Sequence, residues 1–172
     1  LEQYAEAIDD ACLHKYFSKY WDNDMKKWKY SGVQLIDEVN NLKPRAVLDV
    51  GCGYNEFKGK INNLIGIDPY NNKADLEVGT LQYRTDQKFD VILCLGSVNF
   101  GSRDKIIAEV GRCVDLLAEG GTMFFRVNPG VQHDKPEADW IEFYAWNVPF
   151  IIELSEIYNL KILDIRDDTN QR

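Results

Sequence analysis

A glycine turn and two aspartates are the residues of this 172-residue chain whose spacing best suits ligand chemistry. Asp49 lies in a short apolar run that ends at Gly51 and Gly53. Glycines at such a turn let the backbone approach a ligand closely. Asp68 ends the next apolar run, where an acidic side chain in nucleotide-binding α/β folds accepts hydrogen bonds from ribose hydroxyls. The order of strand, glycine turn, strand and aspartate therefore predicts a ligand of the adenosine type.

Glu56 helps to decide which adenosine ligand the turn suits. The dinucleotide fingerprint requires a glycine or alanine three residues after the second glycine, and Glu56 stands at that position. A carboxylate there would repel a pyrophosphate, which argues against a nicotinamide-dependent enzyme. The phosphate loop Gly-x-x-x-x-Gly-Lys-Ser/Thr does not occur in the sequence either. Asp49 and Glu56 suit a positively charged ligand, and S-adenosylmethionine carries a sulfonium and an ammonium group.

Alternating strand and helix patterns position these residues. Apolar runs predict strands at 46–50, 64–68, 89–95, 122–127 and 161–165, with a weaker one at 74–78. Helical patterns cover 31–43, 102–117 and 151–160. Ser31 is a plausible cap for the first of these helices, which Pro44 ends. The alternation predicts an α/β fold in which a mostly parallel, twisted sheet carries helices on both faces.

Four motifs resemble, in order and spacing, those of class I S-adenosylmethionine-dependent methyltransferases. They are Asp-Val-Gly-Cys-Gly at 49–53, Gly-Ile-Asp at 66–68, Phe-Asp-Val-Ile at 89–92 and Leu-Ala-Glu-Gly-Gly-Thr at 117–122. The resemblance covers roughly residues 44–127, and it implies a Rossmann-like domain over 44–172 that binds S-adenosylmethionine and transfers its methyl group. It also implies that the cofactor contacts Asp49, Gly51, Cys52, Gly53, Asp68, Thr80, Leu81, Leu95, Gly96 and Ser97.

The sequence departs from the family pattern in four places. Asn55 replaces the usual third glycine, and asparagine tolerates the left-handed backbone that the turn needs. About a dozen residues separate Gly53 from the second strand, so the intervening helix must be short or replaced by a loop. No acidic residue stands near Thr80, where the family often holds the adenine. The chain stops at 169–172, where a turn into the family's last antiparallel strand would begin, so we expect either a truncated chain or a reduced sheet.

The sequence carries no fixed signature for the methyl acceptor. Methyl transfer mainly requires that the two reactants be positioned, so it needs no set of catalytic residues. His133, after the predicted strand at 122–127, is a candidate general base, although a surface histidine is the simpler reading. Trp140 and Tyr144 either line an acceptor pocket or form a helix face that packs on the core. The sequence has no Cys-x-x-Cys pair and its two histidines are far apart, so we expect no metal site.

Residues 1–43 form a separate segment that is helical and unusually aromatic. Its rings include Tyr16, Tyr20, Trp21, Trp28 and Tyr30. One interpretation is a lid over the carboxyl ends of the strands, which would exclude water and hold a sulfonium by cation–π contact. The other is simple packing of helices against the sheet.

Composition and charge limit the classes of partner that the protein is expected to bind. A formal charge of −8 argues against DNA or RNA as the main partner. No apolar run reaches membrane-spanning length and no signal segment opens the chain, while four scattered cysteines suit reduced thiols in the cytoplasm. We therefore expect a cytoplasmic transferase that methylates a small-molecule acceptor. The alternatives are a non-catalytic module that binds the cofactor or a partner through a reduced methyltransferase fold, and a nicotinamide-dependent enzyme.

Overall fold

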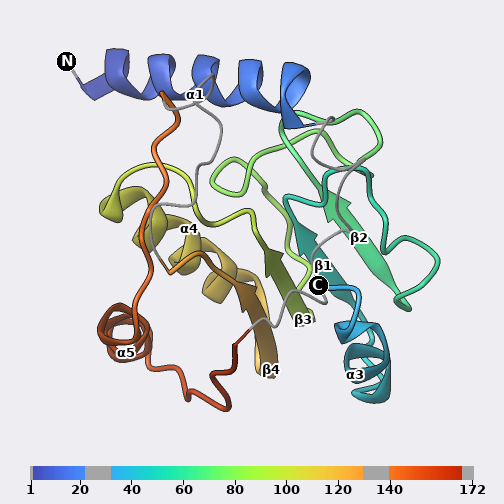
Figure 1. Ribbon diagram of the computed structural model, residues 1–172. Coiled ribbons are helices and arrows are strands. Elements are labelled where there is room, and N and C mark those ends of the chain that lie inside the picture. Colours follow the sequence, from blue (N-terminus) through green and yellow to red (C-terminus); the bar gives the residue numbers. More distant parts are fainter. Residues whose placement is uncertain (1, 22–31, 130–139, 168–172) are drawn as a thin grey trace.

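A four-stranded parallel sheet forms the centre of the computed structural model, which describes residues 2–21, 32–129 and 140–167 (Figure 1). Its strands are β1 (Val47–Val50), β2 (Leu64–Ile67), β3 (Phe89–Leu95) and β4 (Leu117–Arg126). They lie side by side in the order β2-β1-β3-β4, and each pair is parallel. The chain leaves β1 toward β2 on one side and returns to β3 on the other. This reversal places a switch point at the carboxyl end of β1, where open α/β sheets bind ligands.

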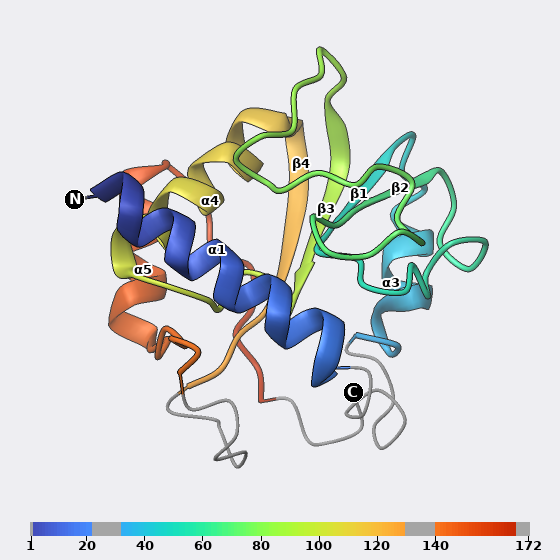
Figure 2. The ribbon, with the colours of Figure 1, turned by 90° about the horizontal axis from the view of Figure 1, so that it is seen from above.

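Helices cover both faces of the sheet, which confirms the predicted α/β architecture. On one face, alternate strand residues such as Val47 and Leu93 pack against Val39 of α3 (Leu35–Asn41). On the other face, Leu48 and Ile92 pack against α4 (Arg103–Leu116) and α5 (Val148–Ile157). Seen from above, α3 lies on the opposite side of the sheet from α4 and α5 (Figure 2). No helix in the described ranges is long and apolar enough to cross a membrane.

Local sequence explains where these two longer helices begin. Ser102 caps α4, and its hydroxyl accepts a hydrogen bond from the Lys105 N–H at 3.3 Å. Asn147 caps α5 in the same way, accepting from the Phe150 N–H at 2.9 Å. The buried residues of α4 are Ile106, Val110, Cys113 and Leu116, a spacing that keeps one stripe of the helix against the sheet.

Two predicted strands are absent from the described structure. Residues 74–78 make only an isolated bridge between Leu76 and Ile67, because the chain turns there and Asp75 bonds Gly66 through both its backbone and its side chain. Residues 161–165 are exposed and form no strand, and Leu163 is 68% exposed. The Arg166 guanidinium just beyond them instead bonds Glu38 of α3 at 2.7 Å. An apolar run becomes a strand only where a neighbour takes up its backbone groups.

The helix predicted at 31–43 is shorter than expected. In the structure α3 begins at Leu35 after Gln34, which makes no side-chain capping bond. Ser31, the predicted cap, lies outside the described residues. The helix ends before Lys43, whose φ of 50° is in the left-handed region.

A loop replaces the helix that would normally follow the glycine turn, as the short spacing predicted. It buries Phe57 and Ile61 against the α3 face of the sheet. The Lys58 ammonium fastens the loop to β2, donating to the Leu64 carbonyl at 2.7 Å and to Asp75 at 2.9 Å. The same Asp75 oxygen accepts from the Gly66 N–H at 2.8 Å. One carboxylate therefore holds both the loop and the outer edge of β2.

We predict that Asp75→Ala lowers the free energy of unfolding by about 1–2 kcal/mol, because it removes the acceptor for Lys58 and for the Gly66 N–H. Urea denaturation followed by circular dichroism measures this loss. Asp86→Ala, which removes an equal charge from an exposed loop position, is the matched control. Equal stability of the two variants would contradict the role given to Asp75.

Candidate functional site

The glycine turn leaves β1 at the carboxyl edge of the sheet with a backbone that only glycine adopts easily. Gly51 and Gly53 have φ values of 68° and 56°. The Gly51 and Cys52 amides both donate to the Ile67 carbonyl, at 2.8 and 3.0 Å, which ties the turn to the end of β2. A Cβ added at Gly51 would overlap the Cβ of Ser97 in the loop after β3. The turn therefore brings together the ends of the three strands that carry the predicted motifs.

Asp68 fixes this arrangement through both of its carboxylate oxygens. Oδ2 accepts from the Gly53 N–H at 2.9 Å, and Oδ1 accepts from the Tyr70 N–H at 2.8 Å. Burial raises the pKa of Asp68, while the backbone hydrogen bonds oppose that rise. A carboxylate offers about four acceptor sites, and Asp68 already accepts from the backbone of Gly53, Tyr70 and Asn71, so about one site is left for a further donor.

Asp49 is a second buried carboxyl, 3% exposed, at the same end of the sheet. Burial, and then the charge of Asp68, raise its pKa from 3.8 to about 7. In the unliganded protein this shift lowers stability as the pH rises from about 4 to about 7, because the folded chain then binds more protons than the unfolded chain. A cation beside Asp49 would favour its charged form and relieve that cost.

Two buried oxygens near the turn lack hydrogen-bond partners within the described part of the chain: Ser97 Oγ and Asn55 Oδ1. The Ser97 hydroxyl lies 3.1 Å from the position of a Gly51 Cβ, so it packs directly against the glycine turn. Asn55 has a φ of 58°, which confirms that asparagine can replace the third glycine of the family pattern. The Glu56 carboxylate lies 3.8 Å from the Lys60 ammonium on the loop, so Asp49 and Asp68 supply the unneutralised acidic character of the turn.

The remaining predicted cofactor residues also lie in turns at the carboxyl edge. Thr80 and Leu81 form a turn in which the next two amides bond the Gly79 carbonyl. A Cβ at Gly79 would lie 3.8 Å from Pro69, directly after Asp68. Leu95 ends β3, and Gly96 follows it with a φ of 103°. The structure thus gathers the residues predicted to contact the cofactor at one edge of the sheet.

The first helix, α1 (Glu2–Lys19), lies across the ends of the strands to which the arrows point (Figures 1 and 2). Tyr16 is 6% exposed and belongs to an aromatic cluster with Phe17, Tyr20 and Phe100. Beyond the helix, the Trp21 ring lies on the glycine turn, where a Cβ at Gly53 would come within 2.5 Å of it. Trp28 and Tyr30, also predicted for this segment, lie outside the described residues.

The aromatic segment after β4 forms no helix at residues 140–147, so the predicted helix face over Trp140–Trp146 does not form. Trp140 packs edge-on against Tyr20, with the ring centroids 6.1 Å apart, and so lies with the α1 cluster. Tyr144 packs instead against Phe150 of α5 at 4.7 Å. Its neighbour Trp146 is a core residue that donates to the Val98 carbonyl at 3.0 Å. His133, the candidate base, lies outside the described residues.

Sequence analysis does not identify Tyr70 or Phe17 as part of this edge. The Tyr70 ring stacks on Phe17 of α1 with a centroid distance of 5.3 Å. The available signal for Tyr70 is its position two residues after Asp68. For Phe17 there is only its place among the other aromatic residues of the segment, because the contact joins residues far apart in the chain.

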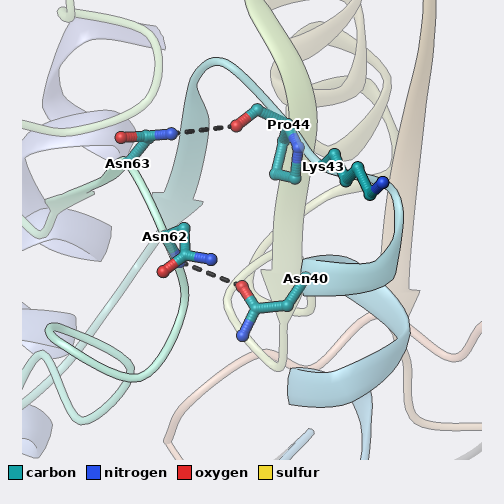
Figure 3. Close-up of a pocket in the computed structure, with 5 residues that line it drawn as sticks. All are labelled: Asn40, Lys43, Pro44, Asn62 and Asn63. Atoms are coloured by element: carbon teal, nitrogen blue, oxygen red, sulfur yellow. Dashed lines mark hydrogen bonds between the residues drawn. The ribbon is translucent and has the colours of Figure 1, made fainter.

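A hollow at the opposite edge of the sheet is lined by residues whose hydrogen bonds stabilise the fold. It measures about 370 Å³ and is lined by Asn40, Lys43, Pro44, Asn62 and Asn63 (Figure 3). Its amides are engaged within the chain: the Asn62 N–H donates to Asn40 Oδ1, and Asn63 Nδ2 donates to the Pro44 carbonyl, both at 3.0 Å. These bonds join the chain segments that enter β1 and β2. The candidate site is therefore the carboxyl edge.

Comparison with known proteins identifies the fold. No family model matches the sequence, and no curated protein matches it. Among solved structures, 1,6-didemethyltoxoflavin-N1-methyltransferase from Burkholderia thailandensis, with bound 1,6-didemethyltoxoflavin and S-adenosylhomocysteine, matches with a TM-score of 0.66 and 16% identity. That match covers 91% of this chain and 78% of that one.

Two further solved structures agree with that match. A S-adenosylmethionine-dependent methyltransferase from Clostridium acetobutylicum has a TM-score of 0.59 and 18% identity, over 90% of this chain and 89% of that one. The N-methyltransferase NodS from Bradyrhizobium japonicum, in complex with S-adenosylhomocysteine, has a TM-score of 0.54 and 17% identity, over 72% of each chain. The chain therefore has the Rossmann-like fold of class I S-adenosylmethionine-dependent methyltransferases.

We predict that Gly51→Ala destabilises the fold more than Gly59→Ala does. Both positions have a positive φ, 68° and 79°, but only the new Cβ at Gly51 would meet Ser97, while that at Gly59 meets nothing within 4 Å. Each variant should lose about 1 kcal/mol through backbone strain, and Gly51→Ala a further 1–3 kcal/mol, roughly, through overpacking. Urea unfolding of the two variants measures the difference. Equal losses would show that the turn does not press against the loop after β3.

Proposed function

We propose that the protein is a cytoplasmic S-adenosylmethionine-dependent methyltransferase that acts on a small-molecule acceptor. The observation that carries the proposal is the double hydrogen bond of Asp68 to Gly53 and Tyr70, which sets a ribose-binding carboxylate against a glycine turn at the switch point of the sheet. Solved methyltransferases with this fold hold S-adenosylhomocysteine, which supports the choice of cofactor.

The residues present suit this cofactor. Asp68 retains an acceptor site for a ribose hydroxyl, and Asp49 would meet a positive charge. The unpartnered Ser97 hydroxyl, beside Gly51, is placed to take a polar ligand atom. Thr80 and Leu81 would flank the adenine beside the end of β2. When bound, the cofactor supplies an electrophilic methyl group, and the work of this chain is to hold and orient the two reactants and to exclude water.

Within the aromatic segment predicted at residues 1–43, α1 and Trp21 are proposed as the lid of this site, whereas α3 packs on a face of the sheet. The support for this lid is the position of α1 across the carboxyl edge and of Trp21 on Gly53. Rings at that position would shield a sulfonium from water and attract it by cation–π contact. Trp140, which packs on Tyr20, would border the acceptor from the other side.

A non-catalytic binding module is the second candidate. It is favoured by the same Trp21 ring, which occupies the approach to Gly53, and by the sheet of only four strands in the described residues. Transfer of labelled methyl groups to a cytosolic small-molecule extract separates the two candidates, because only an enzyme gives a labelled product. The net charge of −8 supports small molecules over nucleic acids as acceptors.

We expect the wild-type protein to bind S-adenosylhomocysteine and Asp68→Ala to bind it at least about tenfold more weakly. The variant loses a hydrogen bond to a charged acceptor, worth about 1.5–3 kcal/mol. Isothermal titration calorimetry measures both affinities, with Asp86→Ala as a control of equal charge. A folded Asp68→Ala protein with unchanged affinity would refute the ribose assignment, and a wild-type protein that fails to bind would refute the cofactor.

The affinity for S-adenosylmethionine should rise with pH across neutrality. Asp49 has a pKa of about 7, so it is mostly neutral at pH 6 and mostly charged at pH 8. If the charged form attracts the cationic ligand, the affinity increases by up to about tenfold over that range. Titrations at pH 6, 7 and 8 test this, with adenosine as a ligand that lacks the cationic groups. Asp49→Asn should give a flat profile, and a wild-type profile as flat as that of the variant would exclude Asp49 as the cause.

A further inference from the structure

Tyr70 links α1 to the predicted ribose carboxylate. Its N–H donates to Asp68 Oδ1 at 2.8 Å. Its side chain contacts α1. The ring stacks on Phe17 of α1, with the ring planes 9° apart. The hydroxyl donates to Asp10 Oδ1 of α1 at 2.7 Å, and the His14 ring of the same helix meets Tyr70 edge-on.

The chain following α1 reaches the same carboxylate by a second route. Trp21 lies on Gly53, and the Gly53 N–H donates to Asp68 Oδ2 at 2.9 Å. The contacts therefore form a closed circuit. It runs from α1 through Tyr70, Asp68 and Gly53 to Trp21, which follows α1 in the chain. A helix held at two points that share one carboxylate cannot leave the glycine turn without breaking one of them.

The Tyr70 hydroxyl is suited to hold α1 through a hydrogen bond to Asp10. Burial first, and then the hydrogen bond and charge of Asp10, raise the pKa of Tyr70 above its ordinary value, so the hydroxyl remains a donor. Asp68 and Glu109 act on it in the same direction. A hydroxyl that donates to a carboxylate makes one of the stronger hydrogen bonds found in proteins. The stacked Phe17 ring adds contact area that does not depend on charge.

On the premise of the proposed function, we infer that Tyr70 is a positioning residue that holds α1 over the glycine turn and thereby slows the release of S-adenosylmethionine. The fastening is made by the Tyr70 side chain with Phe17 and Asp10. It sets how long the lid stays closed, while Asp68 sets how the ribose is held.

Hydrogen–deuterium exchange of the unliganded full chain tests the fastening without any cofactor. In Tyr70→Ala, the amides of α1 should exchange at least about tenfold faster than in the wild type, while those of β1 and β3 remain protected. Tyr70→Phe and Asp10→Ala each remove the same hydrogen bond, so each should give a smaller increase and the double variant no more than either. Ser18→Ala is the control on α1, since its hydroxyl bonds only the Lys15 carbonyl within the helix. Unchanged exchange of α1 in Tyr70→Ala, or additive effects in the double variant, would overturn the inference.

Stopped-flow measurement with S-adenosylhomocysteine tests the consequence for release. We expect Tyr70→Ala to release the ligand at least about tenfold faster, with an association rate equal to or above that of the wild type. Tyr70→Phe, which keeps the stacked ring, should recover most of the slow release. Wild-type release rates in Tyr70→Ala would overturn the inference even if α1 exchanges faster. If the wild-type protein binds no S-adenosylhomocysteine, the proposed function fails, and the exchange result still decides whether Tyr70 fastens α1.

Discussion

The carboxylate of Asp68 is the constraint on which the arrangement of the carboxyl edge depends. It stands at the end of one strand and accepts hydrogen bonds from the turn that leaves the neighbouring strand and from its own following residue. The turn it holds is pressed against Ser97 and is also covered by Trp21. Three strand ends and the N-terminal segment therefore meet around the Asp68 side chain. The backbone amides offset part of the cost of burying its charge. A ligand that binds there would find its hydrogen-bonding partner already oriented.

The parts of this edge that sequence analysis predicted are those governed by local constraints. A left-handed turn needs glycine or asparagine, so Gly51, Gly53 and Asn55 are recognisable without a structure. Strands buried on both faces read as short apolar runs, and β1 and β3 were found on that basis. The number of residues after Gly53 limited the segment to a short helix or a loop, and the structure has the loop.

The parts that could not be predicted depend on partners far apart in the chain. The apolar residues at 161–165 suit a strand, but whether a strand forms is decided by a neighbour that the run itself does not specify. The side chain of Asp75 accepts a hydrogen bond from the Gly66 amide, and the spacing of apolar residues in the sequence does not indicate this contact. The aromatic residues of α1 were recognised as unusual, yet their pairing with Tyr70 and Phe100 is a property of the folded chain alone.

The loop after Gly53 has an electrostatic consequence. In many α/β proteins a helix begins at this point, and the partial positive charge of its dipole attracts phosphates and carboxylates. Residues 51–63 form turns and isolated bridges with no helix among them, so no such dipole faces the site from this segment. The charges that the strand ends contribute at the turn are then those of the two buried acids, Asp49 and Asp68, which are negative when ionised. A phosphate placed beside these acids in their ionised form would be repelled and a cationic group would be attracted, so the sign of the charge that a ligand brings to the turn matters in addition to its shape.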